Sequence, residues 1–167
     1  MNVEFYLEKL FGLDEFKNFV KENEGAYLCS AFFIIDKEGK EDKQHFDFYI
    51  PKDKKAYSFQ FLEEGAKFTP LEDFKEKAPE KVSITKVDFK EIEGIIMDEM
   101  EKNKVKAKIQ KIIISLQKIN GKNMILGTVF ISMFGLLKVN IDLETKKVVD
   151  FDKMSFFDMM RVHKKEK

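Results

Sequence analysis

Residues that carry specialised chemistry are scarce in this chain of 167 residues. Its one cysteine, Cys29, cannot form a disulfide within the chain, and a small chain without disulfides is typical of a reducing compartment. The sequence has a single arginine, Arg161, and no tryptophan. Arginine supplies the planar fork that binds phosphate, guanine or carboxylate through two parallel hydrogen bonds, so recognition of an anion by clustered arginines is excluded.

The chain also has no excess of charge of either sign. Thirty basic and thirty acidic residues give a formal net charge of zero, which leaves no overall field to attract a phosphate backbone. We therefore expect no nucleic acid partner. No run of eighteen apolar residues is present, and residues 1–5 lack the basic start and apolar run of a secretory signal. The sequence predicts a cytoplasmic protein without stable membrane insertion.

Apolar residues are abundant and regularly spaced in the first part of the chain. Hydrophobic residues make up 44% of the sequence and include eighteen phenylalanines, enough for a packed core. In residues 3–23 the apolar positions recur every three or four residues, which predicts an amphipathic helix. Gly12 and Asp14 leave open whether this is one bent helix or two short ones.

Three β-rich segments follow, at residues 27–35, 46–50 and 57–61. In the second and third, apolar and polar residues alternate, which is typical of an antiparallel meander with one solvated face. The pattern weakens after residue 62. We interpret residues 63–87 as a connector, in which residues 71–77 have the composition for two helical turns.

The second half begins with another helix, predicted to start near Asp88 and to end near Asn103. A strand is then predicted over residues 105–119. It ends at Asn120-Gly121, the strongest short-range hairpin signal, because both central residues of a type I′ turn need a positive φ.

The last part of the second half is predicted as a long return strand and a final hairpin. The return strand covers residues 124–141, with Gly127 and Gly135 as bulges or bends. The final hairpin turns at residues 142–145 and returns over residues 147–151.

The order helix, strand, strand, strand therefore occurs twice. Residues 48–59 and 139–151 share an isoleucine, an acidic turn, a Lys-Lys pair and a phenylalanine, although any two amphipathic hairpins with lysine-rich turns are alike in this way. We predict an α+β protein of two similar units, each an amphipathic helix packed on a curved antiparallel β-meander. Whether the two sheets lie edge to edge or face to face is left open. The predicted divisions are a first unit (1–62), a connector (63–87), a second unit (88–155) and a C-terminal tail (156–167).

The hairpin of the second unit resembles those of PepSY-like domains, which have the broader cystatin-like architecture. The resemblance is carried by Val139-Asn140-Ile141-Asp142 with Thr145 and Val148, and Lys146 stands where that family has a turn glycine. It implies one helix packed across a curved antiparallel sheet and a binding or inhibitory role. It transfers no catalytic residue.

Few residues qualify as candidates for chemistry. Cys29 lies in an apolar strand, which favours a buried structural thiol. His45 and His163 are far apart, and no motif joins either to a nucleophile. No phosphate-binding glycine loop, zinc motif or EF-hand pattern is present. The sequence favours a non-enzymatic protein and predicts no cofactor.

Two acidic groups are candidates for a metal site. Asp150 and Asp152 share one face of a strand, and Asp158 and His163 follow within reach. That face is also the one expected to be solvated. The second group, Asp98, Glu99 and Glu101, has the pattern of the wet side of a helix. We expect no metal.

The aromatic side chains on the predicted strands allow two interpretations. They form either a filled core or the lining of an apolar cavity between helix and sheet. The C-terminal residues 156–162 add two Phe and two Met beside a basic end, which favours packing on the sheet, partner docking or a weak membrane contact. The leading hypothesis is a non-enzymatic protein-interaction or regulatory module that presents its sheet edges or this C-terminal stretch to a protein partner or to a second copy of itself. The alternative is a carrier of a small apolar ligand.

Overall fold

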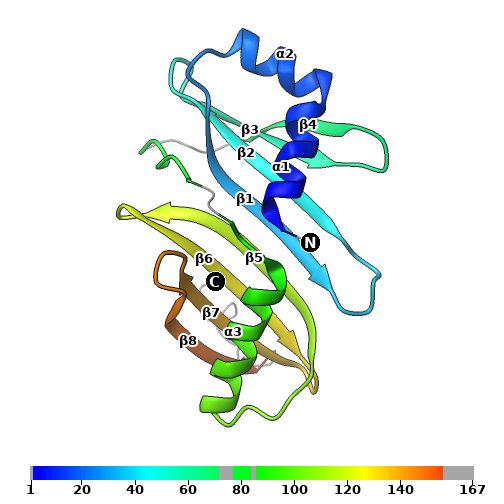
Figure 1. Cartoon of the computed structure of the whole chain (residues 1–167), viewed down its shortest axis with the longest axis vertical. Helices are drawn as coiled ribbons and strands as arrows, with labels where there is room; N and C mark the ends of the chain where they lie inside the picture. The colour runs from blue at the N-terminus through cyan, green and yellow to red at the C-terminus, as the bar shows by residue number, and fades with distance from the viewer. Residues whose placement is uncertain (1, 72–76, 84–85, 156–167) are drawn as a thin grey trace, which may run out of the picture.

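The computed structural model describes residues 2–71, 77–83 and 86–155. These residues form three helices and one antiparallel sheet of eight strands, so the α+β class is confirmed (Figure 1). The elements of the first half are α1 (Val3–Gly12), α2 (Asp14–Glu22), β1 (Tyr27–Asp36), β2 (Lys43–Ile50), β3 (Lys55–Phe61) and β4 (Ala66–Leu71). Those of the second half are α3 (Phe89–Lys102), β5 (Ile109–Ile119), β6 (Lys122–Ile131), β7 (Gly135–Asp142) and β8 (Lys147–Ser155).

Capping residues determine where the helices begin and end. Asn2 accepts a hydrogen bond from the backbone N–H of Phe5 at 3.0 Å and so starts α1. The extended backbone of Leu13 (φ −73°, ψ 135°) separates α1 from α2, so the chain forms two short helices rather than one bent one. Asp88 caps α3 through the N–H groups of Lys90 and Glu91, as the sequence predicts.

The sheet has the strand order β4-β3-β2-β1-β5-β6-β7-β8. Its centre is the antiparallel pair β1–β5, in register from Ser30 opposite Gln117 to Asp36 opposite Lys111. The two halves of the chain therefore join edge to edge in one sheet, which decides between the two arrangements that the sequence left open.

Three segments differ from the sequence prediction. Residues 105–108, predicted as the start of a strand, are irregular, and β5 begins only at Ile109. Residues 66–71, assigned to the connector, form strand β4 on β3. Pro70 weakened the strand pattern, but an edge strand tolerates proline because its outer N–H groups need no partner. The predicted return strand over 124–141 is two strands, because residues 132–134 form a turn between β6 and β7. Of the two helical turns predicted over residues 71–77, residues 72–76 lie outside the described part of the chain.

Each half thus contributes four consecutive strands after its helices, and not three. Counted along the chain, the hairpin β2–β3 corresponds to β6–β7. The sequence similarity between residues 48–59 and 139–151 instead pairs β2–β3 with β7–β8. That alignment therefore gives no support to a duplication, and two similar units remain a prediction.

All three helices cover the same face of the sheet (Figure 1). In the first half, the rings of Phe16 and Phe19 pack on Phe48 and Phe59 with centroid separations of 5.0–6.2 Å. In the second, Ile92, Ile96 and Met100 of α3 are buried in the same core cluster. The aromatic side chains on this face therefore pack as a core.

Phe33 on β1 connects the two halves of this core. Its side chain is 1% exposed, and its ring lies 5.8 Å from Tyr6 of α1 and 4.9 Å from Phe89 at the start of α3. The neighbouring residue, Phe32, points to the opposite face and stacks on His45. Removing the Phe33 ring takes contacts from both helices at once.

We predict that Phe33→Ala lowers the free energy of unfolding by about 3–5 kcal/mol, because it leaves a cavity under both helices. Unfolding should remain a single transition in urea, followed by circular dichroism. Phe32→Ala is the matched control and should have a clearly smaller effect. Two separate transitions in the variant would contradict a shared core.

Candidate functional site

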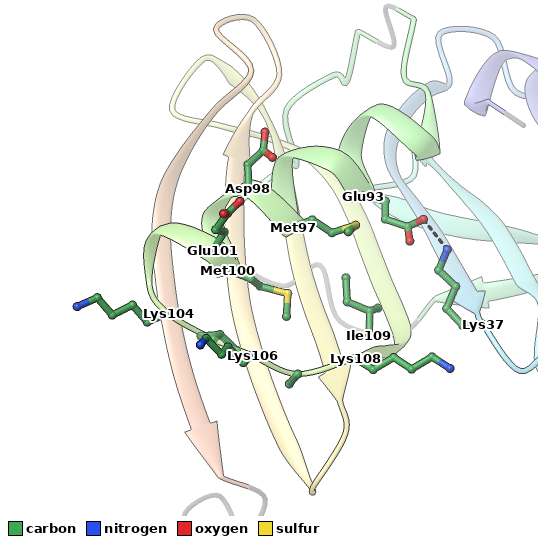
Figure 2. Close-up of a pocket in the computed structure, with 12 residues that line it drawn as sticks. Lys37, Glu93, Met97, Asp98, Met100, Glu101, Lys104, Lys106, Lys108 and Ile109 are labelled. Carbon is green, nitrogen blue, oxygen red and sulfur yellow. Dashed lines mark hydrogen bonds and ion pairs between the residues drawn. The ribbon is translucent and has the colours of Figure 1, made fainter.

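A surface hollow lies beside the C-terminal half of α3, and we call it the α3 groove (Figure 2). Its volume is about 840 Å³. The floor is apolar and comes from α3 and from the segment that leads into β5. The groove is lined by Lys37, Glu93, Met97, Asp98, Met100, Glu101, Lys104, Val105, Lys106, Ala107, Lys108 and Ile109.

The chain forms this groove by turning back at the end of α3. Asn103 caps the helix through Glu99, and Lys104 adopts a left-handed conformation with φ 56°. The backbone N–H of Val105 then donates to the carbonyl of Met100 at 2.8 Å. Residues 105–108 run back past the helix in an irregular conformation before β5 starts. Space is left between this segment and the helix.

Methionines give the groove its chemical character. Figure 2 shows Met97 and Met100 reaching from α3 toward Ile109. Met100 and Ile109 are buried, whereas Met97 is 56% exposed. A methionine side chain is flexible and polarizable, so it adapts to apolar groups of different shape. The floor is suited to binding an apolar group.

The rim of the groove carries charges of both signs. Lys37 Nζ lies 2.5 Å from Glu93 Oε2 and closes one end. Asp98 and Glu101 are exposed on α3, and exposed lysines at positions 104, 106 and 108 follow the returning segment. The lining contains no hydroxyl, thiol or imidazole group. The arrangement therefore supports binding better than nucleophilic chemistry.

A second group of polar residues lies on the sheet face that the helices leave uncovered. The β1–β2 register sets Ser30 opposite Asp47 and Phe32 opposite His45. Ser30 Oγ donates to Asp47 Oδ2 at 3.0 Å, and His45 Nε2 lies 3.9 Å from the same oxygen. The other oxygen, Asp47 Oδ1, is buried without a hydrogen bond. Sequence reasoning missed this cluster, which only the hairpin register reveals.

This cluster lacks the serine–imidazole pair of a familiar nucleophilic site. The Ser30 hydroxyl donates to the Asp47 carboxylate, a much weaker base than an imidazole, and not to His45. Cys29, buried as predicted, donates to the carbonyl of Asp47 at 3.3 Å. Burial, with a contribution from the Asp47 charge, raises the pKa of this thiol to about 12. A thiol that stays protonated is a poor nucleophile.

The predicted acidic candidates do not converge. Asp150 Oδ2 pairs with Lys138 at 2.9 Å and accepts from Asn140 at 3.3 Å. Glu99 pairs with Lys102. Asp158 and His163 lie outside the described residues, so their part in a metal site, and any pairing of His163 with a nucleophile, are untested. In residues 2–71, 77–83 and 86–155, no group of three His, Cys, Asp or Glu side chains is placed to hold a metal.

Comparison with known proteins identifies the fold but no family. No protein-family model matches the chain, and no curated protein matches it. A solved structure from Clostridium difficile 630, titled a "putative lipoprotein", superposes with a TM-score of 0.52 at 10% identity. The match covers 84% of this chain and 91% of that one. At this identity the similarity concerns the fold alone.

Within residues 2–71, 77–83 and 86–155, no helix has both the length and the apolar character needed to cross a membrane.

We predict that His45 makes stability depend on pH. Burial lowers the pKa of His45 from its ordinary 6.5, and the nearby Asp47 opposes this only in part. As the pH falls, the unfolded chain binds a proton before the folded one does, so the stability present above pH 6.5 is lost between that pH and the folded pKa.

Urea midpoints measured between about pH 7.5 and 5.5 test this. The wild type should lose more stability over this range than His45→Gln, which cannot titrate. Carboxylates that titrate in both proteins cancel in the difference. Equal slopes would show that His45 is not held in its neutral form.

Proposed function

We propose that this protein is a non-enzymatic interaction module that binds an apolar segment of a protein partner in the α3 groove. The observation that carries the proposal is Met97, a large apolar side chain 56% exposed in the middle of a helix and beside a methionine floor. Met100, Val105 and Ile109 of the lining belong to the core cluster, whereas Met97 does not.

The charges on the rim support a protein partner in particular. Apolar anchors surrounded by polar groups that exclude water are typical of protein interfaces. Lys104, Lys106 and Lys108 on one side, with Asp98 and Glu101 on the other, supply such a rim with both signs. The interaction surface therefore differs from the sheet edges and the C-terminal tail that the sequence suggested.

The carrier of a small apolar ligand is the second candidate. Its support is the volume of about 840 Å³, which falls within the range of small-molecule pockets. The groove is only partly enclosed, and this favours a segment of a partner over an enclosed small molecule.

Two further statements belong to the proposal. We infer that the two halves are related units of the cystatin-like or PepSY-like type. The support is the order helix followed by four strands, present twice and mirrored across the β1–β5 pair. We also place the protein in the cytoplasm, in keeping with one buried, unpaired cysteine.

The partner can be captured by a photo-crosslinking amino acid at position 97 in a lysate of the source cells and identified by mass spectrometry. Its affinity is then measured with purified proteins. We predict that Met97→Gln weakens binding about tenfold, because it places a polar group in the apolar floor. Val20→Gln is the matched control, since Val20 is 47% exposed on α2 in the other half. An equal loss in both variants would exclude the α3 groove as the site.

Native mass spectrometry of the freshly purified chain separates the two candidates. A small apolar molecule that copurifies with the wild type and is lost in Met97→Gln would favour the carrier. Light scattering during size-exclusion chromatography shows whether a second copy of the chain is the partner. A monomer that binds neither a protein nor a ligand at Met97 would overturn the proposal.

A further inference from the structure

The turn between β6 and β7 presents two bulky apolar side chains to solvent. Met133 is 92% exposed and Phe134 is 75% exposed, the largest exposures among the large hydrophobic residues described. The turn lies at the lower end of the second half in Figure 1, at the same end as the C-terminus of α3. We call Met133 and Phe134 the hairpin tip.

The hairpin tip has a backbone conformation that its residue types disfavour. Met133 and Phe134 have φ values of 64° and 57°, both in the left-handed region. The β5–β6 turn uses the same pair of positive φ values, 51° and 79°, at Asn120 and Gly121, the residue types that adopt them most easily. Folding alone would favour residues such as Asn or Gly at each of these left-handed positions, so the apolar pair at the tip requires another explanation.

Lys108 lies beside the turn, and Lys104 and Lys106 precede it on the same segment. The backbone of Ser132 donates to the carbonyl of Lys108 at 2.8 Å, and the N–H of Lys108 donates to Ser132 Oγ at 3.1 Å. These bonds hold the segment that carries Lys104, Lys106 and Lys108 against the turn. All three lysines are exposed, and none makes an ion pair with the residues described.

The sequence beyond β8 has the same combination of apolar and basic residues. Ser155 at the end of β8 pairs with Gly135, directly after the tip. The remaining residues, 156–167, include two Phe, two Met and four basic residues against two acidic ones. Further apolar and basic residues therefore follow a strand that ends beside the hairpin tip.

We propose that the hairpin tip docks on an anionic lipid surface. Met133 and Phe134 enter the boundary between headgroups and acyl chains, while Lys104, Lys106 and Lys108 face the headgroup charges. Lysines beside a membrane bind through charge attraction and keep their long apolar stems near the boundary. Binding of this kind is peripheral and reversible, and it requires no membrane-spanning helix.

A lipid surface fits this end of the molecule better than a protein pocket does. The tip is convex and offers only two apolar side chains, whereas a stable protein interface buries on the order of 1,000 Å² around a packed centre. A fluid bilayer adapts to a convex tip. Lysine acts as a point charge, which suits headgroups that present no fixed geometry.

The fluorescence of a tryptophan introduced at the tip reports insertion directly, because the natural chain contains no tryptophan. Phe134→Trp in the full-length protein is mixed with phosphatidylcholine vesicles, with or without about 30 mol% phosphatidylglycerol. We expect a blue shift of emission, and quenching by brominated lipid, only with the anionic vesicles. Phe11→Trp, at a site 52% exposed in the other half, should show neither change.

Two substitutions test the tip and the lysines separately in vesicle cosedimentation. Met133→Asn with Phe134→Gly should reduce binding about fivefold, while the urea midpoint stays equal or rises because Asn-Gly suits the turn. Lys104→Gln, Lys106→Gln and Lys108→Gln together should reduce binding about tenfold. The matched control replaces Lys52, Lys54 and Lys55, exposed around the β2–β3 turn, and should leave binding unchanged.

Several results would overturn this inference. They are the absence of binding to anionic vesicles, equal binding to neutral ones, or binding without quenching at position 134. Binding to vesicles that survives about 0.5 M NaCl unchanged would also exclude the role of the lysines. Crosslinking of position 134 to a protein and not to lipid would assign the tip to a protein interface. The inference shares Lys104, Lys106 and Lys108 with the rim of the α3 groove. The two proposals are told apart by the readouts at positions 133 and 134, which do not involve Met97.

Discussion

The pairing of β1 with β5 is the constraint on which the rest of the structure depends. It joins two four-stranded halves into one sheet, in a register that places Phe33 opposite Ile114. Both residues then face the same side of the sheet, and the helices of both halves must cover that side. Phe33, in contact with Tyr6 and Phe89, is the point at which the two helical layers share a core. Neither half buries this face completely on its own.

This arrangement also determines where functional surfaces can lie. Because all three helices lie on one face, the polar cluster around Asp47 occupies the other face, where burial keeps the Cys29 thiol protonated. The α3 groove and the hairpin tip are both found at the end of the second half, where the chain leaves α3 and returns along β5. The same segment, residues 104–108, forms one wall of the groove and lies against the tip. The first half has its own exposed residues, but it has no comparable combination of apolar floor, apolar tip and unpaired lysines in the part of the chain that is described.

Local signals in the sequence predicted local structure well. The cap at Asp88 and the Asn120-Gly121 turn were located correctly because each acts through bonds or dihedral angles within a few residues. The β1–β5 pairing joins residues more than seventy positions apart, and the apolar alternation of β5 fits several partners equally well. Strand β4 was hidden by Pro70, which an edge position tolerates. The candidate groove could not be predicted, because it depends on the path of the chain after Lys104 and on the distance between α3 and that path.

The turn at residues 132–134 was missed for a reason that bears on function. Turn prediction relies on residues that adopt positive φ easily, and Met133 and Phe134 do not. A sequence that obeyed local rules at this position would have been easier to predict and would fold with less strain. Departures from such rules that have no structural compensation are concentrated at functional sites. Met97 departs less strongly from these rules. An exposed methionine causes no backbone strain in a helix, but most of its apolar surface stays in water and does not stabilise the fold. Met97, Met133 and Phe134 all lie at one end of the molecule. Their exposure does not stabilise the fold, and binding to a partner or to a lipid surface would account for it.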